Sequence, residues 1–107
     1  MTTKVDKVKI SNSGGVFLAH ATIHWGAYGS GPQPVSLSLG ESHTWDLVDM
    51  GIPSGWGFWA VVHAVAGETV SSPKDKYIYE ANTGVTVHYQ ISGSTYSVKI
   101  ESDIDPN

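Results

Sequence analysis

Apolar and polar residues alternate along much of the chain, as they do in β-strands that bury one face. Over residues 16–25 the odd positions are apolar, whereas the even positions change from apolar to polar at His20. This change predicts a strand that is covered on both sides at its start and wet on one side at its end. Residues 85–91 and 96–101 alternate in the same way on either side of Ser92-Gly-Ser94, which predicts a compact hairpin.

Further strands are predicted at residues 5–11, 33–39, 43–47, 57–65 and 76–80. The segment 57–65 is the most continuously apolar, so we expect it to be central. Turn signals separate these segments, at residues 12–15, 26–32, 51–55, 66–68, 71–73 and 82–84. The pattern predicts an all-β fold, a single-domain β-sandwich of about 7–8 mostly antiparallel strands over residues 1–107. We expect residues 1–3 and 103–107 to be frayed.

The composition of the chain excludes several classes of function. With 40% apolar and only 15% charged residues, the 107-residue chain does not have the composition of a disordered protein. Cysteine is absent, which excludes disulfides, thiolate catalysis and cysteine-ligated zinc. The chain has no arginine and a formal charge of -4, which argues against nucleic acid as a partner and against electrostatic docking onto anionic lipid. Any membrane contact then falls to neutral and aromatic side chains.

The polar N-terminus contains no apolar core of a secretory signal peptide, and no stretch is apolar enough to span a membrane. We therefore expect a soluble protein that is made in the cytoplasm.

Histidines and carboxylates are the candidate chemical groups. His20 and His24 lie about 13 Å apart if they share a strand, which is too far for one ion, so a metal site would need partners from other strands. We expect no metal site. Protonation of all five histidines near pH 6 would move the net charge from -4 to about +1, which is one possible pH response.

Asp46 and Asp49 have the residue types of a glycosidase acid and base. The chain is too short for a deep cleft beside its core, so we expect turn carboxylates or ligand acceptors instead. We predict no catalytic residue, no cofactor and no enzyme activity.

Aromatic residues near glycine-rich turns are the more informative feature. Trp25 and Trp59 fall on strand positions that are compatible with the core. Trp56 falls in a loop, where an exposed and a structural role are both open. Exposed tyrosine and tryptophan either stack on sugar rings or sit at a membrane interface, because each ring has an apolar body and a polar edge.

Five short motifs occur in an order that resembles a family of very small bacterial insecticidal proteins active on rootworm beetle larvae. The motifs, spread over roughly residues 8–92, are Ile10-Ser-Asn-Ser13, His24-Trp-Gly26, Thr44-Trp-Asp46, Asp49 and Gly57-Phe58. The chain departs from the family pattern at Leu47, where a basic residue is expected, and in its longer loop over residues 48–56. More distantly, the layout resembles the aegerolysins, which are lipid-binding β-sandwiches, and the membrane-recognition domain of cholesterol-dependent cytolysins.

The resemblance implies an insecticidal or cytolytic protein that acts extracellularly and binds a lipid or glycan on the membrane of a target gut cell. Pore formation would require a homo-oligomer or a larger pore-forming partner, because several chains must supply the strands of a barrel. The alternative is a carbohydrate-binding lectin without membrane activity. The candidate ligand-binding residues are Tyr28, Trp45, Asp46, Asp49, Trp56 and His24.

Overall fold

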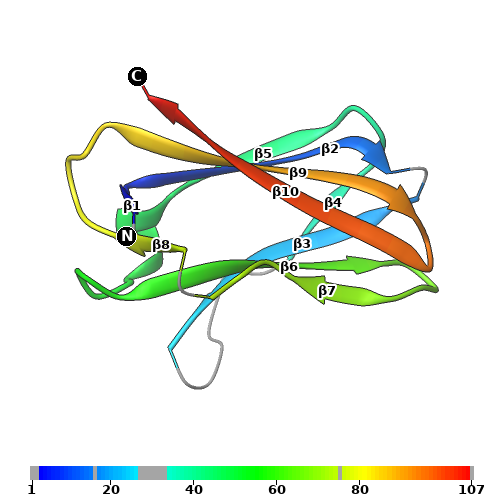
Figure 1. The fold of residues 1–107 in the computed structure, drawn as a ribbon, viewed down its shortest axis with the longest axis horizontal. Coiled ribbons are helices and arrows are strands. Elements are labelled where there is room, and N and C mark those ends of the chain that lie inside the picture. The colour runs from blue at the N-terminus through cyan, green and yellow to red at the C-terminus, as the bar shows by residue number, and fades with distance from the viewer. Residues whose placement is uncertain (1–2, 16, 27–33, 75, 107) are drawn as a thin grey trace.

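The computed structural model describes residues 3–15, 17–26, 34–74 and 76–106. Two sheets pack face to face in them, as the two layers in Figure 1 show. Sheet A has the order β1 (Thr3–Val5), β8 (Tyr77–Tyr79), β6 (Gly57–Ala64), β3 (Ala19–Trp25) and β4 (Val35–Leu37), with β7 (Thr69–Ser71) also paired to β6. Sheet B has the order β10 (Ser97–Pro106), β9 (Val85–Ser94), β2 (Lys7–Gly15) and β5 (Ser42–Asp46). The predicted β-sandwich is confirmed.

Most strand pairs are antiparallel, including the long hairpin β9–β10. Two pairs are parallel, β1 with β8 and β2 with β9, so the first strands of the chain are held by its last third. The described residues form ten strands rather than 7–8, because the three-residue strands β1 and β7 are too short to produce an alternation pattern. The strand β6 lies inside sheet A, as its apolar sequence predicted.

The C-terminal segment differs from the expectation of fraying. Residues 103–106 continue β10, and every residue of β10 pairs with β9, as far as Pro106 opposite Val85. At the other end of the chain, Thr3 begins β1. The reason is that β9 is ten residues long and begins at Val85, so it offers backbone partners to the whole C-terminal tail.

The turn predicted at residues 12–15 is also wrong, since these residues continue β2. The register against β9 shifts between Asn12 and Gly14, which is a β-bulge. A side chain at Gly14 would come within 3.2 Å of the Ser92 Cβ, so glycine allows the two strands to approach. The Asn12 amide is buried and donates hydrogen bonds to the carbonyls of Phe17 and Leu37 at 3.0 and 3.1 Å.

The core lies between the sheets and is made by one face of each long strand. In β6, Phe58, Ala60, Val62 and Ala64 are fully buried, whereas Trp59 and His63 point to the opposite, outer face. Trp25 packs against the core as expected. Trp59 does not belong to the core, because it follows the buried Phe58 by one residue and successive side chains of a strand alternate.

Between β5 and β6 the chain forms one turn of 3-10 helix, η1 (Leu47–Met50). No helix in the described residues has the length and apolar character that crossing a membrane requires.

Candidate functional site

A small polar pocket opens at the end of the sandwich. It is lined by residues of β8, the start of β2 and η1, which are the elements on the left of Figure 1. Its volume is about 190 Å³, and its lining residues are Asp6, Lys7, Asp46, Val48, Tyr79, Ala81 and Asn82. These come from three parts of the chain: the β1–β2 junction, the β5–η1 junction, and the connection from β8 to β9. The lining carries two carboxylates, one ammonium group, one amide and one phenol.

Asp6 ties these three segments together. Its backbone carbonyl accepts from Leu47 N at 3.0 Å, and its backbone N donates to Val85 O at 3.1 Å. Its carboxylate oxygen Oδ2 accepts from Gly84 N at 3.0 Å. The other oxygen, Oδ1, is buried and has no hydrogen-bond partner among the described residues. This oxygen can still accept a hydrogen bond, which a donor group of a ligand in the pocket would provide.

Asp46 begins η1 and is exposed. It is the N-cap residue, and its Oδ1 accepts from Val48 N at 3.4 Å, a long hydrogen bond. Its strand partner in β2 is Lys7, so a positive and a negative side chain line the pocket from neighbouring strands. Asp49 lies one turn further along in η1 and is exposed outside the pocket lining.

Asn82 and Tyr79 complete the wall. Asn82 has φ of 63°, in the left-handed region that asparagine tolerates better than most residues. Tyr79 is buried, and its backbone pairs with the loop before β6: Tyr79 N donates to Trp56 O at 2.9 Å, and Gly55 N donates to Tyr79 O at 2.8 Å. The Trp56 backbone is therefore next to a residue of the pocket wall.

The Trp56 side chain is 48% exposed and lies against Gly26. Gly26 has φ of 73°, and a methyl group added there would come within 2.9 Å of Trp56 Cζ3. Glycine is therefore required at position 26 for two reasons: the backbone has a positive φ, and the Trp56 ring leaves no room for a side chain. This contact joins the His24-Trp-Gly26 motif to the loop over residues 51–56, two segments whose proximity the sequence did not show.

The remaining predicted site residues lie elsewhere. Trp45 is half-buried against the core, with the His43 ring edge-on at 4.6 Å between centroids. His24 lies on the outer face of sheet A beside Trp59, 6.3 Å between ring centroids. Tyr28 lies outside the described residues. Of the six predicted residues, Asp46 lines the pocket and Trp56 adjoins it.

Sequence reasoning missed Asp6, Lys7, Tyr79 and Asn82. They lie in two segments that are far apart in the sequence, the β1–β2 junction and the end of β8 with its connection to β9, and only the parallel pairing of β1 with β8 and of β2 with β9 brings them together. The one local signal was the turn predicted at residues 82–84.

Histidine, aspartate and glutamate side chains do not gather in threes as a metal site requires, within the described residues. A scan against protein-family models and searches of curated proteins and of solved structures found no match to this chain.

Proposed function

We propose that this protein is a toxin-like binding protein, insecticidal or cytolytic, that recognises a lipid head group or glycan on a target cell membrane through the end pocket and Trp56. The observation that carries the proposal is the lining of the pocket, in which Asp6, Asp46, Lys7 and Asn82 bring acceptors and donors together in about 190 Å³. Acting on a gut cell, such a protein works outside the cell that makes it.

Pocket size and chemistry both favour a small polar group. Pockets for drug-sized ligands span roughly 300–1,000 Å³, so this one suits a single sugar ring or a head group rather than a whole ligand. Carboxylates accept hydrogen bonds from hydroxyl groups, whereas lysine and asparagine donate to ligand oxygens. A hydroxyl-rich group therefore uses both kinds of residue in the lining.

Trp56 supplies the apolar part of the proposed site. Its backbone pairs with Tyr79 of the pocket wall, and its exposed ring offers a surface on which a sugar face can stack or which can enter a membrane interface. If toxicity requires a pore, several copies of this chain or a larger pore-forming partner must provide the transmembrane strands.

The second candidate is a lectin without membrane activity, and the polar lining of the pocket favours it as strongly. A glycan array and sedimentation with liposomes of insect-gut lipid extract distinguish the two. Binding to liposomes that contain no glycan supports lipid recognition, whereas sugar-specific binding without liposome binding supports the lectin.

Two variants test the pocket while preserving the backbone. Asn82→Gly removes the amide at a position whose positive φ glycine accepts, and Asp46→Asn removes the charge but keeps an N-cap acceptor. Each should weaken binding about tenfold, the effect of losing one hydrogen bond of about 1.4 kcal/mol to the ligand.

Ala66→Gly is the matched control. Ala66 also has φ of 63°, but it lies in the turn after β6, at the opposite end of that strand from the pocket. It should bind like the wild type. Wild-type affinity in both pocket variants would rule out the pocket as the binding site.

A further inference from the structure

Three of the five histidines gather on the outer face of sheet A, away from the end pocket. His20 of β3 is directly opposite His63 of β6, with ring centroids 6.4 Å apart. Four residues further along the same pair of strands, His24 is opposite Trp59. We call His20, His24, His63, Trp59 and Lys74 the histidine face.

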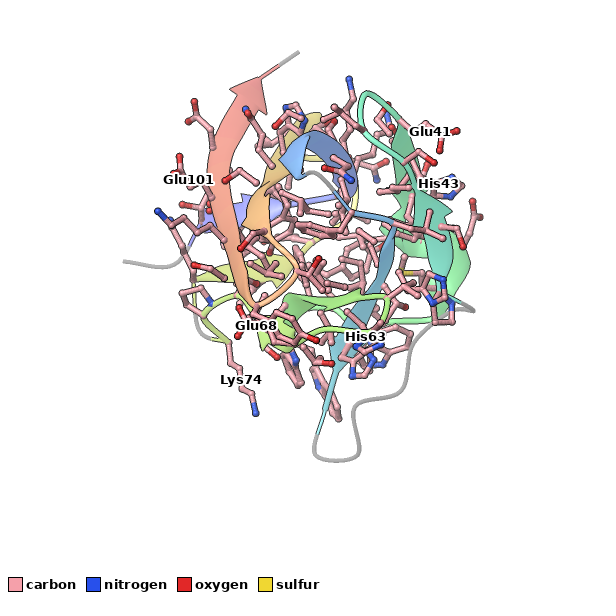
Figure 2. The ribbon with its side chains drawn as sticks, turned by 90° about the vertical axis from the view of Figure 1, so that its right-hand side faces the viewer. Glu41, His43, His63, Glu68, Lys74 and Glu101 are labelled. Atoms are coloured by element: carbon pink, nitrogen blue, oxygen red, sulfur yellow. The ribbon has the colours of Figure 1, made fainter. Side chains whose placement is uncertain are left out.

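Lys74 extends the charge of this face. Its Nζ lies 4.9 Å from the centroid of the Trp59 ring, within the range of a cation–π contact. In Figure 2, His63 and Lys74 both lie on the lower side of the molecule, where sheet A faces away from sheet B. No described element packs over this side of the sheet.

The described residues that pair with these histidines across sheet A carry no negative charge. Next to His20, β4 contributes Ser36, and next to His63, β7 contributes Thr69, whose hydroxyl is 2.7 Å from His63 Nδ1. Beyond β6, the outward residue of β8 is Ile78, and Lys4 of β1 is paired with Glu80 at 3.1 Å.

Glu68, in the turn after His63, uses its carboxylate to accept from Val98 N at 2.6 Å, toward sheet B. The histidine face therefore has its own positive charge in Lys74, and the carboxylates of Glu68 and Glu80 are each paired with another group.

From this charge distribution we infer that the histidine face docks onto an anionic lipid bilayer at acidic pH and releases it at neutral pH. At neutral pH the chain carries a net charge of -4, which opposes such a contact. Histidine side chains gain charge as pH falls through the range between about 8 and 5. Protonation then gives the face four positive charges, three on imidazoles and one on Lys74.

A bilayer fits this face better than an acidic polypeptide does. The face is a sheet surface rather than a groove, and Trp59 is an aromatic side chain of the kind enriched at membrane interfaces. Each basic group near an anionic bilayer contributes about 1 kcal/mol, so three new charges predict tighter binding by on the order of one hundredfold. This inference is independent of the ligand in the end pocket.

The experiment is sedimentation of the purified protein with vesicles of phosphatidylcholine, alone or with one-third phosphatidylserine, at pH 7.5 and 5.5. The test variant is the triple change His20→Gln, His24→Gln and His63→Gln. The matched control changes the two sheet B histidines, His43→Gln and His88→Gln, so that both proteins lose protonation sites but only one loses the face. Circular dichroism checks that both variants fold.

We expect binding at pH 5.5 to the anionic vesicles only, lost in the triple variant and retained in the control. Equal binding at both pH values, equal binding to neutral vesicles, absence of binding, or retention in the triple variant would each overturn the inference. Binding of soluble polyglutamate without vesicle binding would overturn the assignment to a bilayer. The triple variant leaves every lining residue of the end pocket unchanged, so a loss of anionic-vesicle binding in that variant is assigned to the histidine face and not to the pocket.

Discussion

Replacing Tyr89 by phenylalanine should make the protein more stable, although it removes a polar group from the middle of the fold. Tyr89 lies in β9 and is fully buried, and its ring packs edge-on against Tyr77 with centroids 6.0 Å apart. Its hydroxyl has no hydrogen-bond partner in proper geometry among the described residues. Burial raises the pKa of this hydroxyl well above its usual range, while the nearby Ser72 hydroxyl opposes the rise.

A buried polar group without a partner costs about 1–3 kcal/mol of desolvation free energy, and phenylalanine keeps the ring and its packing. We therefore expect Tyr89→Phe to raise the free energy of unfolding by about 1 kcal/mol. For a domain of this size, that corresponds to a rise in Tm of about 4–5 °C. Urea denaturation and thermal melts followed by circular dichroism measure both quantities.

Tyr77→Phe is the matched control, because the Tyr77 hydroxyl is 2.7 Å from Ser102 Oγ and its loss removes a formed hydrogen bond. This change should lower stability by about 0.5–1.5 kcal/mol. A Tyr89→Phe variant destabilised as much as Tyr77→Phe would refute the reasoning, because it would show that the Tyr89 hydroxyl makes a favourable contact.

The sign of the pH dependence gives a second readout for Tyr89. Above about pH 10 the unfolded chain releases the tyrosine proton, whereas the folded chain retains it because its pKa is raised. The contribution of the Tyr89 hydroxyl to the free energy of unfolding is therefore present below pH 10 and is lost as the pH rises further. The stability of Tyr89→Phe should fall less steeply than that of the wild type above pH 10, and equal slopes would contradict the assignment.

Two further substitutions test positions where the fold depends on one residue. Gly26→Ala should lower the free energy of unfolding by about 1–3 kcal/mol and alter tryptophan fluorescence, because it adds a clash with Trp56 to the strain of a positive φ. The control is Gly51→Ala, where φ is 81° and the space is open, so only the backbone strain should appear. Equal effects of the two changes would argue against the contact with Trp56. Asn12→Ala should lower the free energy of unfolding by about 2–4 kcal/mol in chemical denaturation, because the carbonyls of Phe17 and Leu37 lose their donor. Ser13→Ala, at an exposed position, should change it by no more than about 0.5 kcal/mol, and a similarly small loss at Asn12 would contradict this role.

Alternation alone determined the fold class and the position of most strands. Strict alternation is a local property, and it predicted which residues of β3 and β9 face the core, as the buried Ala21 and Val87 show. It failed where tertiary contacts override local signals. The glycines at residues 14–15 resemble a turn but form a bulged strand, because β9 supplies a partner. The polar tail appeared frayed but pairs with the start of β9.

The candidate sites divide in the same way. The sequence by itself determined that aromatic and acidic residues fall at turns, and so singled out Asp46 and Trp56, because turn chemistry is written in neighbouring residues. Only the tertiary structure decided that Asp6 and Asn82 share a pocket with Asp46, since parallel pairing joins segments more than seventy residues apart. It also decided that His20 meets His63, because cross-strand register depends on how sheet A assembles and not on the spacing within either strand.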